Sequence, residues 1–342
     1  MARSRIRDRI QCAAARLIAR LPNRAKIALS GEPPVVVDGQ QLDSQAQFLR
    51  AVRRGRGFTG LLDPSIDAGR RRYRRETDIF RGPMTPVDTV RDFEIAGPAG
   101  SLRVRHYGAP SRSLLVYLHG GGFVIGDLDT HDEPCRILCR HANTQVLSVE
   151  YRLAPEHPFP AAVDDARAAF EWARANAASL GADPDCVSVG GDSAGGNLAG
   201  AVAQRSPRPC AQLLIYPATD MNASYPSQRL FGDGYLLSVR DCDLCVGHYT
   251  SGAEVARDDP RLSLVHAPNL GELPRALIAI AGFDVLRDEG EAFAQALQSA
   301  GVSVRTLRVP SLEHGFIHMT GVCPKARDAL LAIAREWRML VG

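Results

Sequence analysis

From about Leu102 onward, the chain alternates short apolar runs with longer stretches that have helical character. Short apolar runs separated by helical segments are typical of parallel strands joined by crossover helices. The pattern therefore predicts an α/β fold built on a largely parallel sheet. We expect its strands at 102–107, 114–118, 145–149, 186–189, 212–216, 276–281 and 304–309.

Two of the connecting helices are well marked in the sequence. Residues 161–180 are rich in alanine and are followed by Gly181, and residues 288–300 are followed by Gly301, as expected where a helix ends. Residues 220–259 are too long and too mixed in character to be an ordinary connection between two strands. We interpret this insert and residues 1–95 as a cap over the functional site, and we assign residues 96–342 to the catalytic domain.

Composition and charge exclude several classes of function. The 342 residues are 45% hydrophobic, which suits one large core, and the net charge is only +3. Five arginines between residues 70 and 75 are followed by acidic residues and lack an aromatic platform, so they predict a solvated helical face rather than a nucleic-acid contact. No run reaches the ~20 apolar residues of a membrane span. We expect neither a nucleic-acid partner nor stable membrane insertion.

The eight cysteines do not predict a metal site. Cys242 and Cys245 have a C-x-x-C spacing, but no second pair supplies the two further ligands of a structural zinc. We expect neither a metal nor another cofactor. Arg16 and Arg20 interrupt the apolar N-terminal stretch, which argues against a secretory signal. Together with the scattered thiols, this favours a cytoplasmic location.

The segment Gly-Gly-Asp-Ser-Ala-Gly-Gly at 190–196 follows an apolar run and opens a helical stretch. It contains G-x-S-x-G, which at a strand–turn–helix junction exposes a nucleophilic serine above the sheet of α/β-hydrolases. In a chain with 31 glycines this pentapeptide is a weak signal by itself. We predict Ser193 as the nucleophile, in a turn formed with Gly191, Asp192 and Gly195.

A second glycine-rich element strengthens this prediction. The segment His-Gly-Gly-Gly-Phe at 119–123 comes directly after the strand at 114–118. Bare glycine backbone allows N–H groups to point at the oxyanion that forms during acyl transfer. We predict Gly121, Gly122 and Ala194 as the oxyanion donors. His119 lies too near the end of its strand to be the base, and we expect it to brace this loop together with Gly120.

The base and the acid should follow the serine, because this fold provides its triad in the order nucleophile, acid, histidine. His314 follows the strand at 304–309 and is the predicted base, with His318 as the alternative. Asp284 ends the apolar run 276–283 and is the predicted acid, which fixes the tautomer of the imidazole. Asp288 is expected instead to stabilise the N-terminus of the next helix.

With these residues in place, the chain resembles the hormone-sensitive lipase family of esterases and lipases (bacterial family IV) over about residues 95–340. The resemblance rests on 119–122, on 191–195, on 284–290 and on Tyr-Arg-Leu-Ala-Pro-Glu at 151–156. It implies an α/β-hydrolase fold, with a central, mostly parallel eight-stranded sheet flanked by helices and a helical cap. It also implies hydrolysis of small-molecule esters with short to medium acyl chains. Many members have proline after the acid, where this chain has Val285.

Other functions remain open on the same scaffold. An amidase or another acyl hydrolase would use the same triad and oxyanion hole. A non-catalytic ligand receptor would lack the base, whereas His314 is present here. The sequence therefore favours a serine esterase that acts through an acyl-enzyme. It leaves open the natural substrate and whether the chain forms a homodimer.

Overall fold

The computed structural model describes residues 15–55, 57–58, 60–205 and 207–342. Its centre is an eight-stranded sheet with the strand order β10-β9-β8-β7-β5-β6-β4-β3. The pairs from β10 to β6 are parallel, and β4 and β3 are antiparallel at one edge. The strands are β3 (Thr89–Gly97), β4 (Gly100–Gly108), β5 (Leu114–Leu118), β6 (Gln145–Glu150), β7 (Val187–Asp192), β8 (Gln212–Ile215), β9 (Ala276–Phe283) and β10 (Val304–Glu313). The predicted α/β class with a mostly parallel sheet is confirmed.

Strand β3 is the element of this sheet that the sequence did not predict. It lies at an edge, and Ile95 is its one buried residue. An edge strand with so little buried surface lacks the apolar run that marks the central strands, such as β5, which is buried along its whole length. The predicted domain boundary at residue 96 falls inside this strand.

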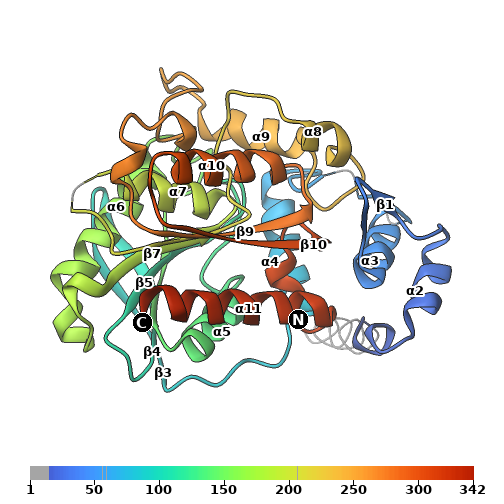
Figure 1. Cartoon of the computed structure of the whole chain (residues 1–342), viewed down its shortest axis with the longest axis horizontal. Helices are drawn as coiled ribbons and strands as arrows, with labels where there is room; N and C mark the ends of the chain where they lie inside the picture. Colours follow the sequence, from blue (N-terminus) through green and yellow to red (C-terminus); the bar gives the residue numbers. More distant parts are fainter. Residues whose placement is uncertain (1–14, 56, 59, 206) are drawn as a thin grey trace.

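Helices cover both faces of the sheet (Figure 1). On one face lie α6 (Ala161–Ala175), α7 (Ala194–Ala203) and α10 (Arg287–Ser299), whose residues Phe170, Leu198 and Phe293 share one buried apolar cluster. On the other face α5 (Asp132–Ala142) packs against α11 (Pro324–Val341), and Trp337 is fully buried there. The helix predicted at 161–180 ends as an α-helix at Ala175 and continues as the short 3₁₀ turn η1 (Ala177–Leu180).

The N-terminal segment lies at the side of the molecule to which β9 and β10 point (Figure 1). It contains α2 (Asn23–Ser30), the short hairpin of β1 (Val36–Val37) and β2 (Gln40–Gln41), α3 (Ser44–Gly55) and α4 (Ile66–Phe80). The insert after β8 forms α8 (Pro226–Phe231) and α9 (Val239–Tyr249). The remaining 3₁₀ turns are η2 (Pro184–Cys186), η3 (Leu264–His266), η4 (Leu270–Glu272) and η5 (Phe316–Met319). Within the described ranges, no helix is both long and apolar enough to cross a membrane.

Candidate active site

Three parallel strands of the sheet are directly followed by the three predicted triad residues. Ser193 directly follows β7, Asp284 directly follows β9, and His314 directly follows β10. The carboxyl ends of parallel strands lie on the same edge of a sheet, which is where α/β proteins place their sites. Ser193 and His314 keep 9% and 8% of their surface exposed, whereas Asp284 keeps 1%. Asp284 is thus more buried than the two residues that line the cavity.

The backbone at Ser193 has the strained conformation of a nucleophile elbow. Its φ of 54° and ψ of −121° are unusual for a residue with a side chain, and such strain costs about 1–3 kcal/mol. Hydrogen bonds hold the turn, since the Ser193 amide donates to the carbonyl of Ile215 at 2.9 Å. A Cβ at Gly195 would collide with the carbonyl oxygen of Leu118, so helix α7 can approach the sheet this closely only with glycine.

The three side chains form one hydrogen-bonded line. Ser193 Oγ lies 2.9 Å from Nε2 of His314, and Nδ1 of the same ring lies 2.7 Å from Oδ2 of Asp284. The other carboxylate oxygen, Oδ1, accepts the amide hydrogen of Leu286 at 2.9 Å. With Nδ1–H donating to Asp284, Nε2 is free to accept the serine proton. The arrangement can therefore generate an oxygen nucleophile at Ser193.

The glycine loop lies against the serine. Gly121 and Gly122 have φ angles of 124° and 61°, and both line the same cavity as Ser193 and Ala194. A Cβ at Gly121 would collide with the carbonyl of Ile125, and one at Gly122 with Sγ of Cys245. Ala194 is the first residue of α7, where backbone N–H groups have no acceptor within the helix. The three predicted donors thus belong to residues that line the same cavity as Ser193.

The two histidines set aside as bases make other contacts. Nε2 of His318 lies 2.8 Å from the hydroxyl of Tyr73, and burial together with neighbouring His131 lowers the pKa of His318 to about 3. His119 stacks on Tyr151 with ring centroids 4.2 Å apart, and burial lowers its pKa to about 4. Both rings stay neutral at physiological pH, and each is part of the packing around the glycine loop.

Asp288, the alternative acid, is turned away from the triad. Its Oδ2 accepts the amide hydrogen of Ser227 at 2.8 Å, and its Oδ1 pairs with Arg287. It lies in the first turn of α10, as the sequence predicts. The carboxylate that contacts His314 is that of Asp284.

Cys242 and Cys245 line the cavity rather than forming a metal site of their own. Burial raises the pKa of Cys242 well above its usual value and that of Cys245 to about 12. Zinc binding and redox exchange both need the thiolate, which is scarce at such pKa values.

Among the described residues, the group with metal-ligand spacing is instead His131, Asp192 and His318, whose ligand atoms lie within 4.8 Å of one another. The sequence did not predict this group, because its members come from three distant segments. Each already has protein partners. His131 contacts Thr130, Asp192 accepts from Tyr117, and His318 contacts Tyr73. We therefore assign the group to a hydrogen-bond network.

A buried carboxyl group also lines the cavity. Glu289 accepts hydrogen bonds from the amides of Thr219 at 2.7 Å and Asp220 at 3.3 Å, yet burial raises its pKa to about 8. Between its usual value of 4.5 and about 8, the folded protein holds a proton that the unfolded chain has released. Stability contributed by this group is therefore greatest in acid and declines as the pH rises through this window.

We expect Glu289→Gln to stabilise the protein increasingly as the pH is raised. Glutamine keeps an oxygen for the two amides and has no proton to lose. The difference in Tm between the variant and the wild type should become more positive between pH 5 and pH 8 in thermal unfolding. Glu291→Gln is the control and should show no such trend, since Glu291 is on the same helix but half-buried and paired with Arg308. A pH-independent difference for Glu289→Gln would contradict the raised pKa.

The sheet topology and the serine elbow after β7 define the α/β-hydrolase fold. Residues 115–318 match the family model described as alpha/beta hydrolase fold, and the chain belongs to this family. It is 47% identical over 313 residues to the carboxylic ester hydrolase LipN of Mycobacterium tuberculosis, covering 87% of this chain and 83% of that protein. It is 34% identical to an ethyl acetate hydrolase of Pseudomonas putida, covering 84% and 95%.

A solved structure, the hyperthermophilic esterase from the archaeon Pyrobaculum calidifontis, superposes with a TM-score of 0.80 at 34% identity. The superposition covers 86% of this chain and 98% of that one. These similarities confirm the predicted fold and the resemblance to bacterial esterases.

Proposed function

We propose that the chain is a carboxylic-ester hydrolase that forms an acyl-enzyme on Ser193. The observation that carries this proposal is the hydrogen-bonded line from Ser193 through His314 to Asp284 at the wall of an apolar cavity. The similarity to proteins named as ester hydrolases supports the same reaction.

In the proposed mechanism, Nε2 of His314 takes the hydroxyl proton as Ser193 Oγ attacks the ester carbonyl. The amides of Gly121, Gly122 and Ala194 donate to the oxyanion of the tetrahedral intermediate. The imidazolium then gives its proton to the leaving alcohol, and the acyl group stays on the serine. A water molecule, activated by the same ring, repeats these steps and releases the acid. In this scheme His314 accepts and returns each proton that is transferred.

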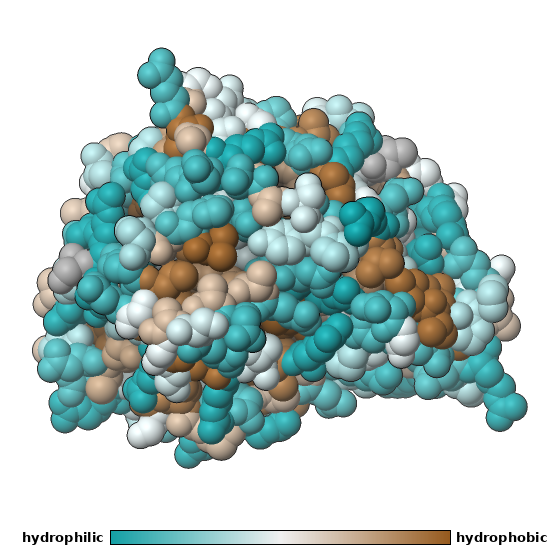
Figure 2. Space-filling model, turned by 45° about the horizontal axis from the view of Figure 1, so that its top comes forward, coloured by the Kyte–Doolittle hydropathy of each residue, from teal (hydrophilic) through white to brown (hydrophobic). Residues whose placement is uncertain are grey.

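We propose esters with short to medium acyl chains as the substrates. The cavity beside Ser193 has a volume of about 360 Å³, near the lower end of ligand pockets, which span roughly 300–1,000 Å³. On the face shown in Figure 2, apolar residues form several small patches separated by polar surface. A dissolved small ester fits this distribution better than an oil–water interface does.

The substrate class can be tested with p-nitrophenyl esters of two to sixteen acyl carbons. We expect kcat/KM to be highest among the short to medium esters and to fall for the longest. A matched anilide tests the amidase alternative, which uses the same triad. Turnover of the anilide without turnover of any ester would replace the proposed function by an amidase.

The N-terminal segment and the insert are proposed to form the cap that covers the cavity. Residues of both contribute to its lining, including Leu61 and Phe80 from the first and Met221 and Val246 from the second. The free thiols of the cysteines in the described ranges support the further proposal of a reducing, cytoplasmic location.

Val246→Phe is expected to narrow the acyl-length preference, because Val246 on α9 lines the cavity and a larger ring would fill part of it. One methylene in such a pocket is worth about 10- to 200-fold in kcat/KM, so octanoate should lose about tenfold or more while acetate changes little. Leu244→Phe is the matched control, since Leu244 is on the same helix but exposed. Equal losses across all esters would argue against the cap proposal.

A further inference from the structure

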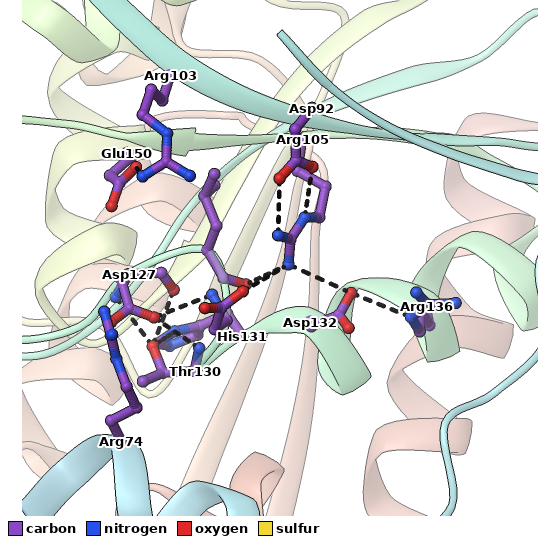
Figure 3. Close-up of polar contacts among 12 residues, drawn as sticks. Arg74, Asp92, Arg103, Arg105, Asp127, Thr130, His131, Asp132, Arg136 and Glu150 are labelled. Atoms are coloured by element: carbon purple, nitrogen blue, oxygen red, sulfur yellow. Dashed lines mark hydrogen bonds and ion pairs between the residues drawn. The ribbon is translucent and has the colours of Figure 1, made fainter.

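Helix α4 contacts the loop that carries the proposed oxyanion donors. The predicted solvated face holds for the exposed Arg71, Arg74 and Arg75, whereas Arg70 and Arg72 are half-buried. Nε of Arg70 donates to the carbonyl of Val124 at 2.8 Å, just beyond Gly122. Nε of Arg74 donates to Oδ2 of Asp127 at 2.9 Å, and Figure 3 shows this arginine reaching from α4 to the loop. The cap helix therefore holds this loop from outside.

A chain of hydrogen bonds continues inward from Asp127. Its Oδ1 accepts the amide hydrogen of Thr130 at 2.8 Å. The Thr130 hydroxyl accepts from the amide of Asp127 at 2.9 Å and donates to the carbonyl of Asp127 at 2.8 Å. Its remaining lone pair faces Nδ1 of His131 at 2.9 Å, so this nitrogen carries the hydrogen. Figure 3 shows Asp127, Thr130 and His131 following one another behind Arg74.

The inner end of this chain is Asp192. Nε2 of His131 lies 3.2 Å from Oδ1 of Asp192. Burial by itself would raise the pKa of Asp192, but His131 and the hydroxyl of Tyr117 outweigh it, so the pKa falls below its usual range. The side chain is thus a buried carboxylate, with His131 and Tyr117 as neighbours. Hydrogen bonds to a charged acceptor are roughly twice as strong as neutral ones.

Asp192 links the oxyanion loop to the nucleophile. Its Oδ1 accepts the amide hydrogen of Gly120 at 2.9 Å, and Gly120 is followed by the proposed donors Gly121 and Gly122. Asp192 itself directly precedes Ser193 in the chain. A Cβ at Gly120 would collide with the Asp192 carboxylate, so the two segments are in close contact. One carboxylate therefore sets the position of the loop relative to the serine.

We infer that Asp192 is a positioning residue for the oxyanion hole, and that Arg74, Asp127, Thr130 and His131 hold it in place from the cap. The inference deepens the proposed function and rests on it. Preorganised donors stabilise an oxyanion at about 2.7–3.1 Å, and a misplacement of about 1 Å can cost about 10²-fold in rate. Loosening this chain should therefore lower kcat while substrate binding changes little.

The test measures kcat for p-nitrophenyl butyrate in the wild type and in each variant. The enzyme concentration is taken as the concentration of serine that a fluorophosphonate can titrate. Asp192→Ala should lower kcat by about 10²- to 10³-fold, the cost of losing an oxyanion donor. Asp192→Asn should lower it by about tenfold, because the amide oxygen can still accept from Gly120. Thr130→Val and Arg74→Met remove links farther out and should each lower it about three- to tenfold, with KM within twofold. Arg112→Met, which breaks a surface pair with Asp183, is the control and should behave as the wild type.

The inhibition constant of a boronic acid, which forms a tetrahedral adduct on the serine, is the second measurement. We expect it to rise in parallel with the loss of kcat in Thr130→Val and Arg74→Met. A substitution that affected only folding would lower Tm and the fraction of serine that can be titrated. It would leave kcat per titratable serine and the inhibition constant of the boronic acid unchanged. Wild-type kcat and boronate affinity in these two variants would overturn the inference. Lack of esterase turnover in the wild type would instead overturn the proposed function.

Discussion

Ser193→Ala is expected to lower kcat for p-nitrophenyl esters by about 10⁴- to 10⁶-fold, the cost of removing a member of a triad that acts as a unit. Alanine removes the oxygen that lies 2.9 Å from Nε2 of His314, and without it no acyl-enzyme can form at this position. The variant should remain folded, because the turn is held by backbone hydrogen bonds such as that from residue 193 to Ile215. Steady-state kinetics and circular dichroism measure the two expectations.

The control for this variant is Ser224→Ala. Ser224 lines the same cavity but is exposed and lies in the insert, so its loss should change kcat by less than a factor of about two. A fluorophosphonate should label the wild type and Ser224→Ala but not Ser193→Ala. If Ser193→Ala kept more than a tenth of the wild-type rate, the assignment of the nucleophile would be wrong.

The parts of the site that could be predicted are those that local sequence specifies. The elbow at Ser193 needs glycine neighbours, and the loop at Gly121 and Gly122 needs positive φ angles, so both leave a pattern in a few consecutive residues. Asp284 and His314 come from distant segments. They could be predicted because each directly follows an apolar strand, and parallel strands bring their ends together.

The parts that could not be predicted depend on contacts between polar residues of distant segments. Tyr73 of the N-terminal segment meets His318 of the loop after β10, and neither lies in a pattern that indicates burial. Glu289 lies in the first turn of α10 yet is buried, and its carboxyl group accepts hydrogen bonds from the amides of Thr219 and Asp220. Strand β3 was missed for a related reason, since pairing with β4 rather than apolar content places it in the sheet.

Helix α4 illustrates how such contacts change the interpretation of a charge cluster. Consecutive arginines in a sequence usually indicate a solvated face, and on this face the carboxylates of Glu156 and Asp127 also bind Arg70 and Arg74. Surface ion pairs of this kind contribute little to stability, typically about 0–1 kcal/mol. In this molecule the arginines serve to position the chain, because both contact segments next to the glycine loop.

Asp284→Asn is expected to lower kcat by about 10⁴-fold with little effect on stability, as when a triad carboxylate is exchanged for an amide in serine proteases. The structure gives a specific reason. Oδ1 of Asp284 accepts the amide hydrogen of Leu286 at 2.9 Å, so an asparagine would place its oxygen there and turn its NH₂ group toward His314. An NH₂ group facing Nδ1 favours the tautomer with hydrogen on Nε2, and that tautomer cannot accept the serine proton.

Asp288→Asn is the matched comparison, since Asp288 is the other aspartate at the start of α10 and contacts Ser227 and Arg287 rather than His314. It should lower kcat by less than about tenfold. Because the wrong tautomer impairs proton transfer rather than ester binding, KM of Asp284→Asn should stay within a few-fold of the wild type. Steady-state kinetics of both variants with p-nitrophenyl butyrate measure the contrast. A larger loss of kcat in Asp288→Asn than in Asp284→Asn would show that the triad acid had been assigned to the wrong residue.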